Sequence, residues 1–311
     1  MGGRTGDRER EAPVVSGAAL PAIAVATIVV LGLNWPIMST GVQAITPMWL
    51  ASMRLLGAGV VVGIGMGMTG RLRLPGRSDY SIVLSVAALR LAIVYGLVFS
   101  ALAIVPPGRS SMLVYTSSLW TAPLAAWLLR ERLTALKVGA VLIGVVGVVL
   151  LIEPWGADAS ATGSVAGYGM LLGAALATAA GTVHIRGHRW TGSPLSLMPW
   201  QLLLAGVLTS IAAIALEGAP RVDWDLSAVA IVAYQIVLAT AFGLWGLLTL
   251  GRSLPALSTS LLLMAVPVVG VLGSVAFVGE GLTGATVGGM ALVLAAVGSS
   301  VVADHATGNR T

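Results

Sequence analysis

The sequence contains one pattern twice, and this repeat limits the possible folds more than any other feature. The stretch 129–139 reads Leu-Arg-Glu-Arg-Leu-Thr-Ala-Leu-Lys-Val-Gly, and a shift of 149 residues brings it onto a related stretch near the C-terminus. The pairs matched by this shift are Glu131 with Glu280, Leu133 with Leu282, Thr134 with Thr283, Val138 with Val287, Gly139 with Gly288, Pro106 with Pro255, Ser111 with Ser260 and Leu113 with Leu262. A shift of 147 residues matches Pro47, Leu55, Leu56, Gly59 and Val60 with Pro194, Leu202, Leu203, Gly206 and Val207. The chain is therefore predicted to be a duplicated unit.

The composition indicates that the solvent of this chain is a lipid bilayer. Hydrophobic residues make up 57% of the sequence, charged residues only 9%, and the mean hydropathy is +0.96. Apolar runs repeatedly reach membrane-spanning length, which predicts a polytopic membrane protein. The Lys and Arg residues lie in short loops and form no patch with aromatic residues, so nucleic acid is not an expected partner. The absence of cysteine excludes disulfides and thiol-based metal sites.

Ten membrane-spanning helices are predicted when about 20 apolar residues are required for each span. They cover residues 18–41, 46–69, 80–104, 107–129, 134–152, 163–185, 195–216, 226–250, 254–278 and 281–303. Proline and glycine residues in the intervening stretches mark the turns. Residues 1–16 are polar and are expected to form a disordered tail. The first apolar run is too long for the core of a signal peptide, so we expect it to be retained as an anchor.

The loop charges indicate the orientation, because cytoplasmic loops accumulate Lys and Arg. Thirteen cations fall on one side of the ten predicted spans and two on the other. The larger group is Arg4, Arg8, Arg10, Arg71, Arg73, Arg77, Arg130, Arg132, Lys137, Arg186, Arg189, Arg252 and Arg310, and the smaller is Arg109 and Arg221. Both termini are therefore predicted to lie in the cytoplasm, with the protein in the cytoplasmic (inner) membrane.

The repeat and the orientation together predict two inverted halves. Each half contains five helices, an odd number, so Glu131 is expected on the cytoplasmic face and its counterpart Glu280 on the outer face. Inverted repeats that enclose a site near the membrane midplane are a known basis of alternating access. The predicted organisation is a cytoplasmic tail (1–16), a first five-helix repeat (17–153), an outer linker (154–162), a second repeat (163–303) and a second tail (304–311). A duplicated structural scaffold or a receptor is the alternative to a transporter.

Two stretches resemble the EamA type of the drug/metabolite transporter superfamily. The first is Ala101-Leu102-Ala103-Ile104-Val105-Pro106-Pro107 followed by Pro123 to Thr134, and the second runs from Pro267 through Gly279-Glu280-Gly281-Leu282-Thr283. The second copy is more similar, because the family pattern favours a proline thirteen residues before the glutamate. The first copy has Ser118 where the second has Pro267, so helix four is expected to lack the bend of helix nine. The resemblance covers residues 18–303 and implies an all-α fold with ten helices in two inverted halves and movement of small metabolites, often the export of amino acids.

Two arginines lie well inside predicted spans, while no Asp or Glu falls within any span. Charged residues in a membrane are costly and usually face a cavity or one another. Arg54 and Arg90 are therefore candidate contacts for a carboxylate-bearing or otherwise anionic ligand. The alternative for Arg54 is a structural arginine that is bonded to carbonyl groups at a helix break. The alternatives for Arg90 are snorkelling or a pocket that faces the cytoplasm. Gln201 is the repeat counterpart of Arg54 and is either a second contact or a helix-packing residue.

Aromatic and hydroxyl residues supply the other candidate contacts. Asn34, Trp35 and Pro36 combine an amide, a ring and a helix breaker in helix one. Tyr234 and Trp245 are eleven residues apart, a spacing that predicts a common helix face. The remaining candidates are Tyr95, Trp200 and a seam on helix four formed by Ser111, Tyr115 and Ser118. Tyr and Trp also form interfacial belts, so this reading stays open for Trp200.

Three further features complete the candidate set. Pro123 and Pro267, with Pro36, are candidate hinges of the two gates, although ordinary helix packing explains them equally well. His184 and His188 have metal-ligand spacing but no third ligand, so a solvated pair is favoured over a metal site. The spans offer no paired Asp, Ser/His or metal ligands, which argues against an intramembrane enzyme. No cofactor is expected.

The sequence therefore predicts a membrane transporter that exports small organic metabolites, most plausibly amino acids, by alternating access. Its expected partners are a small-molecule substrate and the lipid bilayer. The absence of an intramembrane carboxylate favours facilitated exchange over proton-coupled antiport. A flippase for lipids, a channel and an intramembrane enzyme are the alternatives.

Overall fold

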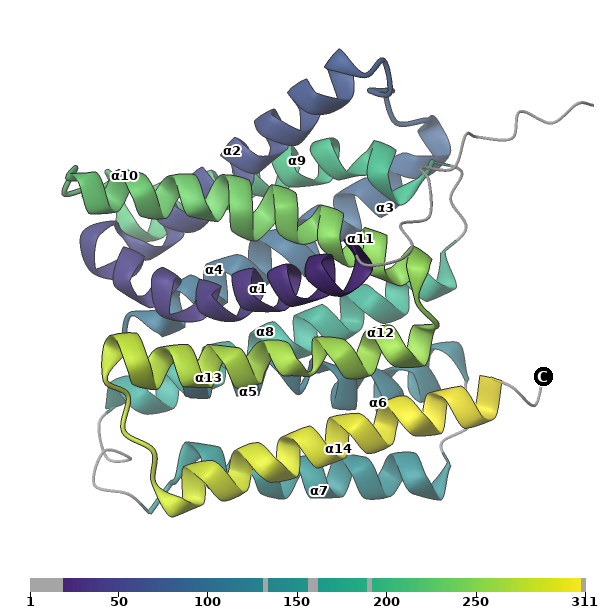
Figure 1. Ribbon diagram of the computed structural model, residues 1–311. Helices are drawn as coiled ribbons and strands as arrows, with labels where there is room; N and C mark the ends of the chain where they lie inside the picture. The colour runs from purple at the N-terminus through teal and green to yellow at the C-terminus, as the bar shows by residue number, and fades with distance from the viewer. Residues whose placement is uncertain (1–18, 131–133, 156–161, 189–191, 309–311) are drawn as a thin grey trace, which may run out of the picture.

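A computed structural model describes residues 19–130, 134–155, 162–188 and 192–308, which are almost wholly helical (Figure 1). The helices are α1 (Ala19–Ala44), α2 (Pro47–Met68), η1 (Arg77–Asp79), α3 (Tyr80–Ser85), η2 (Val86–Ala92), α4 (Ile93–Leu102), α5 (Pro107–Tyr115), α6 (Ser117–Leu129), α7 (Ala135–Ile152), α8 (Thr162–Gly187), α9 (Pro194–Glu217), α10 (Leu226–Ala233), η4 (Tyr234–Phe242), α11 (Gly243–Ser253), α12 (Ala256–Leu263), α13 (Ala265–Val278) and α14 (Gly284–Gly308). Residues 131–133, which include Glu131, lie outside the described residues, and so do the whole of the predicted tail 1–16, most of the predicted outer linker and the last residues of the predicted tail 304–311.

The described helices combine into ten segments that are long and apolar enough to cross a membrane, which confirms the predicted all-α fold with ten spans. The third span joins η1, α3, η2 and α4, and the eighth joins α10, η4 and α11. Residues that favour helix starts define several boundaries: α2, α5 and α9 each begin with proline, whose missing N–H costs nothing in the first turn. The start of α1 and the end of α14 lie on the same side of the bundle (Figure 1).

The two ends of the bundle are named here for the residues that they carry. The Glu280 end is where α13 ends and α14 begins, and the Arg186 end is where α8 ends (left and right in Figure 1). Helix α7 begins at the Arg186 end, whereas α14 begins at the Glu280 end.

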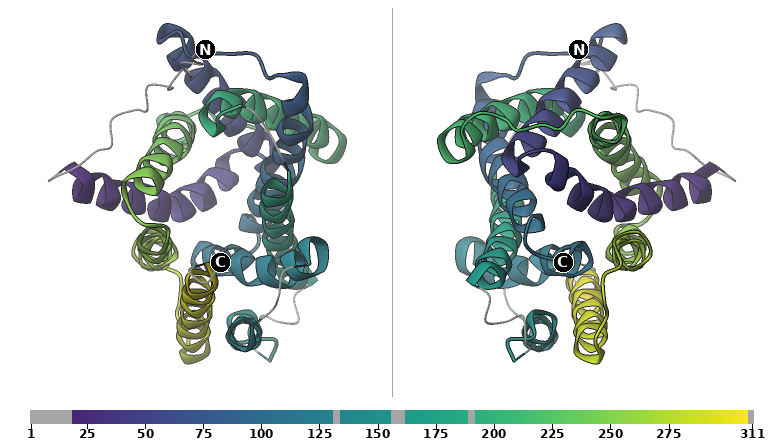
Figure 2. Two further views of the ribbon diagram at one scale, coloured as in Figure 1. Left: turned by 90° about the vertical axis from the view of Figure 1, so that its right-hand side faces the viewer. Right: turned by 90° about the vertical axis from the view of Figure 1, so that its left-hand side faces the viewer.

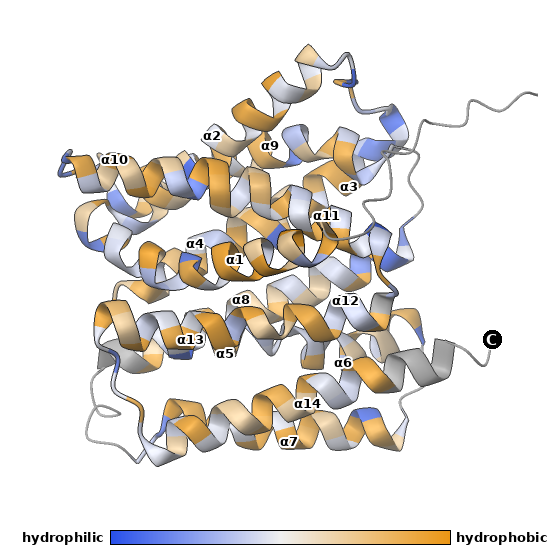
Figure 3. Cartoon of the chain, viewed as in Figure 1, coloured by the Kyte–Doolittle hydropathy of each residue, from blue (hydrophilic) through white to orange (hydrophobic). Residues whose placement is uncertain are grey.

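The helix packing repeats across the chain. Helix α2 packs against α9, and α7 packs against α14. The pair of α7 and α14 forms one edge of the bundle (Figure 2). Helix α1 packs against α13, and α8 packs against α4 and α6. Apolar residues make up much of the spans (Figure 3), and large apolar side chains such as Leu216 and Phe277 are mostly exposed. A surface of this kind fits a lipid environment.

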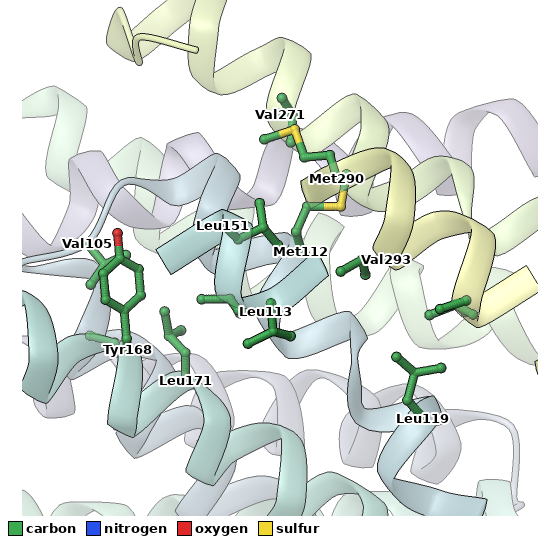
Figure 4. Packing of buried hydrophobic residues seen from close by; sticks show 14 residues of the cluster. Val105, Met112, Leu113, Leu119, Leu151, Tyr168, Leu171, Val271, Met290 and Val293 are labelled. Atoms are coloured by element: carbon green, nitrogen blue, oxygen red, sulfur yellow. The ribbon is translucent and has the colours of Figure 1, made fainter. Parts of the chain in front are cut away.

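A buried cluster holds the α7 and α14 edge to the rest of the bundle. It includes Met112 and Leu113 from α5, Leu151 from α7, Leu171 from α8 and Val293 from α14 (Figure 4). These side chains are almost fully buried, so four helices from both halves share one interior. The core therefore does not separate into two independent domains.

The third and eighth spans each contain a π-helical segment, η2 and η4, at corresponding places in the two repeats. In η4 the Thr240 hydroxyl donates a hydrogen bond to the Gln235 carbonyl at 2.7 Å, five residues earlier. Segments of this type add a residue to a turn and often lie at functional sites.

The fourth span is interrupted, which contradicts the expectation that it lacks the bend of the ninth. Thr116 separates α5 from α6, and Met264 separates α12 from α13, within one residue of the position that corresponds under the shift of 149 residues. The Thr116 hydroxyl donates to the Leu113 carbonyl at 2.6 Å and its N–H bonds the same carbonyl. Side-chain bonding to the preceding turn therefore tightens the helix without proline at position 118.

Candidate functional site

A polar cavity of about 260 Å³ lies toward the Arg186 end and is the candidate site. Six membrane spans contribute to it, through η2, α6, α7, α8, α12 and α14. Its lining residues are Arg90, Ser117, Ser118, Thr121, Ala122, Lys137, Thr178, Thr182, Arg186, Ser260, Ser300 and Val301. Three cations and seven hydroxyl groups therefore surround a space bounded by helices of both halves.

Arg90 is the cation placed deepest along its span. Its guanidinium donates to the Thr182 hydroxyl at 2.7 Å, and the side chain remains exposed although η2 packs against α8 and α9. Gly181 allows this approach, because a Cβ atom there would lie 3.2 Å from Cβ of Arg90. Exposure within the helix bundle fits a side chain that faces a solvent-filled cavity. The sequence left two alternatives to substrate contact for Arg90, snorkelling to the membrane surface and a pocket that faces the cytoplasm. The position of Arg90 in the cavity lining fits the pocket.

Helix α8 contributes one stripe of the lining. Thr178, Thr182 and Arg186 follow one another at intervals of four residues and so lie on one helix face. The Thr178 and Thr182 hydroxyls donate to backbone carbonyls one turn earlier, at 2.8 Å each. Their remaining hydrogen-bonding capacity, with the exposed Arg186, faces the cavity.

Arg54 lies in a different environment, at the centre of a buried cluster of neutral groups. It is 3% exposed, and its guanidinium donates to Thr240 Oγ1 at 2.8 Å and to Gln235 Oε1 at 2.6 Å. Longer contacts reach Asn34 Oδ1 at 3.4 Å and the Tyr95 hydroxyl at 3.4 Å, and the guanidinium carbon lies 4.7 Å from the Tyr95 ring centre. The structure thus brings together Asn34, Arg54 and Tyr95. It gives Arg54 a structural environment built from side-chain oxygens.

Several aromatic candidates lie apart from the cavity. Trp35 is buried in an apolar cluster against α13, where it lies near Gly270. The Trp200 indole donates to the Arg73 carbonyl at 2.9 Å and anchors the loop after α2. The half-buried Gln201 belongs neither to the cavity lining nor to the Arg54 cluster.

Tyr234 and Trp245 do not share a face, which corrects the expectation from their spacing. The Tyr234 hydroxyl donates to the Val30 carbonyl of α1 at 2.6 Å, whereas Trp245 is 47% exposed beside Phe242, with the ring centres 5.7 Å apart. The physical reason is η4, since a π-helical segment changes the angular position of every following residue.

The predicted seam on helix four is likewise divided by the interruption at Thr116. Ser118 lines the cavity, whereas Ser111 is fully buried and donates to the Gly108 carbonyl at 2.7 Å. Tyr115 packs against the apolar cluster that contains Trp35. Pro36, Pro123 and Pro267 lie inside or at the first turn of α1, α6 and α13, and their roles as hinges stay predictions.

A hydrogen-bonded network joins the helices at the Glu280 end. The Glu280 carboxylate accepts hydrogen bonds from the backbone N–H groups of Gly108 at 2.7 Å and Arg109 at 3.1 Å. The Arg109 guanidinium pairs with Glu153 at 3.0 Å, and Glu153 also accepts from Thr283 at 2.6 Å. The network therefore ties the start of α5 to the end of α7 and the start of α14.

Burial raises the pKa of the Glu280 carboxyl above its ordinary value. The two backbone hydrogen bonds and the positive charge of Arg109 oppose this rise without cancelling it. Glu280 is thus a titratable group that holds two spans together.

The histidine pair shows no metal-binding arrangement. The rings of His184 and His188 stack with their centres 5.4 Å apart, and His188 is within 2.9 Å of the Ser81 hydroxyl. Within the residues that the structure describes, no three His, Cys, Asp or Glu side chains are grouped so that they could hold a metal ion.

The sequence predicts only Arg90 and Ser118 among the residues that line the cavity, and it misses Ser117, Thr121, Ala122, Lys137, Thr178, Thr182, Arg186, Ser260, Ser300 and Val301. The signal for three of them was the four-residue spacing on α8. The sequence places Arg186 among the loop cations, because a cation near the end of a membrane span usually marks the cytoplasmic side.

Comparisons with known proteins agree on one family. A model described as the EamA-like transporter family matches residues 20–153 and 165–302. A protein of Salmonella typhimurium (strain LT2), named "Probable amino-acid metabolite efflux pump", is 28% identical over 88% of this chain and 91% of its own length. A protein of the same name from Escherichia coli (strain K12) is 25% identical over 88% and 91%. The protein "Uncharacterized transporter YvbV" of Bacillus subtilis (strain 168) is 24% identical over 87% of each chain.

The fold also has a counterpart among solved structures. A chain described only as "Crystal structure of protein" aligns with a TM-score of 0.59 and 21% identity, over 93% of this chain and 99% of the other. At this identity the likeness supports the fold alone.

Proposed function

Because the chain belongs to the EamA-like transporter family, we propose that it exports small organic metabolites, with amino acids as the first class, by alternating access across the cytoplasmic membrane. Membership makes it a transporter rather than an enzyme. The names of the two efflux-pump relatives support amino-acid metabolites as substrates. The cavity toward the Arg186 end is the proposed substrate site.

The observation that carries the mechanism is the reciprocal contact between α2 and α9. A Cβ atom on Gly59 would lie 2.8 Å from Cγ of Leu203, and one on Gly206 would lie 2.7 Å from Cγ of Leu56. Gly59 corresponds to Gly206 and Leu56 to Leu203 under the shift of 147 residues, so each half makes the same contact with the other. Such exchange of equivalent residues is the sign of a two-fold axis.

The direction of these contacts supports an axis in the membrane plane. Along α2 the contact residues run from 56 to 59, while their partners along α9 run from 206 down to 203, so the two helices are antiparallel. Helices α7 and α14 repeat this relation, because Gly147 meets Val293 and Gly144 meets Ala296. An axis that relates antiparallel spans lies across them, as an inverted repeat requires.

The different states of the two ends support alternating access. The Glu280 end is joined by the Glu280, Arg109 and Glu153 network, while the cavity lies toward the Arg186 end. With the Arg186 end in the cytoplasm, as the loop cations indicate, this conformation is closed outward and ready to receive a cytoplasmic solute.

Counterflow in proteoliposomes tests the function. Vesicles that contain the full chain and an unlabelled amino-acid mixture should accumulate a labelled amino acid transiently, and Gly144→Leu, which fills the contact with Leu119 and Ala296, should reduce the rate. Equal accumulation in protein-free vesicles for every amino acid tested would exclude the function. Flux that persists without a pH gradient is expected for facilitated exchange, whereas strict dependence on the gradient would indicate proton coupling.

A further inference from the structure

We propose that the cavity selects solutes with net negative charge and binds their carboxylate or phosphate oxygens with Arg90 and Arg186. This inference rests on the proposed function, since it treats the cavity as the substrate site, and it narrows the substrate class from amino acids in general to organic acids.

The first argument is the spare hydrogen-bonding capacity of Arg90. A guanidinium group has five N–H donors, and among the described residues the Arg90 group donates only to Thr182. Thr182 and Gly181 hold the side chain against α8, so its orientation is fixed from one side. The side chain is exposed and lines the cavity, so its other donors are accessible to a solute there, in the planar arrangement that matches a carboxylate or phosphate group.

The second argument is the charge of the lining. Arg90 and Arg186 come from η2 and α8, and the lining residues include no Asp or Glu. At the opposite end of the bundle, Arg109 has Glu153 as a counterion. Charges in a partly enclosed site are poorly screened, so an anion that enters gains from the cations around it.

The third argument is that the rest of the lining suits a small polar solute. Hydroxyl groups from α6, α8, α12 and α14 surround the cations and can donate to further solute oxygens. The volume of about 260 Å³ is below the usual range for drug-sized ligands, which excludes large substrates in this conformation. The combination fits a short-chain acid with one or two anionic groups.

The matched pair L-aspartate and L-asparagine tests the inference, because the two solutes have similar size and differ in charge. Binding is measured by calorimetry with the full chain in detergent at low ionic strength. We expect aspartate to bind at least about ten-fold more tightly than asparagine, as a charge-assisted contact predicts. Arg90→Gln should abolish the preference for aspartate over asparagine, and Arg90→Lys should keep part of that preference.

The control is Arg252→Gln, which removes one positive charge from an exposed site at the same end, outside the cavity. It should leave the ratio unchanged. Arg186→Gln should lower the ratio without abolishing it, and it provides a second variant if Arg90→Gln fails to fold. The affinities for glycerol 3-phosphate and glycerol are compared in the same way. This second comparison distinguishes a preference for phosphate from a preference for carboxylate.

Equal binding of aspartate and asparagine, with no preference for glycerol 3-phosphate over glycerol, would overturn the inference, and so would a ratio that survives both Gln variants. Failure of all anionic probes to bind would overturn it as well. If counterflow of neutral amino acids persists in the same preparation, the proposed function stands and only the anion selectivity fails. If no solute shows counterflow, the proposed function fails too.

Discussion

The guanidinium groups of Arg54 and Arg90 lie in two different environments. The guanidinium of Arg54 is enclosed and bonded to oxygens of Thr240, Gln235 and Asn34, so little donor capacity is left for a solute. Arg90 has one described hydrogen-bond partner and faces a cavity. The depth of each residue in its span could be predicted from the sequence, but the difference between them could not. Two of the partners of Arg54, Gln235 and Thr240, lie 181 and 186 residues away in the sequence. Both belong to a π-helical segment whose register no sequence pattern indicated.

Arg54→Met should destabilise the protein more than it affects solute binding. The substitution leaves buried acceptors on Gln235 and Thr240 without their donor, which costs about 1–3 kcal/mol for each unsatisfied group. We expect a lower midpoint of thermal unfolding in detergent, while the aspartate to asparagine ratio is retained. Arg252→Met is the control for loss of an exposed arginine. An unchanged midpoint together with lost binding would assign Arg54 to the substrate instead.

The raised pKa of Glu280 predicts the sign of a pH dependence in the stability of the protein. Burial raises its pKa in the folded protein, so the stability that this group contributes is complete below its ordinary value of 4.5 and is lost as pH rises through the raised value. Glu280→Gln cannot titrate at this position. The unfolding midpoint of the wild type relative to Glu280→Gln should therefore fall as pH rises from about 4.5 toward neutrality. A relative midpoint that rises with pH would mean that the hydrogen bonds to Gly108 and Arg109 outweigh burial.

At the scale of elements, the repeats resemble each other in their irregular parts as well as in their spans. The π-helical segments η2 and η4 correspond, and the interruptions at Thr116 and Met264 lie within one residue of corresponding positions. The ten spans could be predicted because length and hydropathy determine them. The interruption at Thr116 could not, because the expectation relied on proline and overlooked hydroxyl bonding to the preceding turn.

The contact of α2 with α9 predicts unequal effects of two glycine substitutions in one helix. Gly59→Ala places a Cβ atom 2.8 Å from Cγ and 3.0 Å from the backbone nitrogen of Leu203, so the helices must separate, at a cost of about 1–3 kcal/mol. Gly65→Ala, later in α2, meets no atom within 4 Å and should stabilise the helix by up to about 1 kcal/mol. Unfolding midpoints of the two variants in detergent provide the comparison. Equal midpoints would show that α2 and α9 are not tightly packed at Gly59.

For the whole molecule, the duplicated sequence predicts two inverted halves, and the reciprocal contacts between α2 and α9 support that prediction. The position and charge of the cavity depend on which helix faces turn inward, so only Arg90 and Ser118 among its lining residues were predicted. Helices α7 and α14 illustrate the relation, since each begins after a threonine whose hydroxyl accepts from a backbone N–H three residues later. These threonines, Thr134 and Thr283, are counterparts under the shift of 149 residues.

Side-specific labelling of these two positions tests the inverted arrangement most directly. The chain has no cysteine, so Thr134→Cys and Thr283→Cys each provide a unique thiol without further substitutions. A membrane-impermeant maleimide applied to intact cells should label Thr283→Cys and spare Thr134→Cys, and inside-out vesicles should give the reverse. Labelling of both thiols from the same side would contradict the inverted repeat and, with it, the alternating-access mechanism.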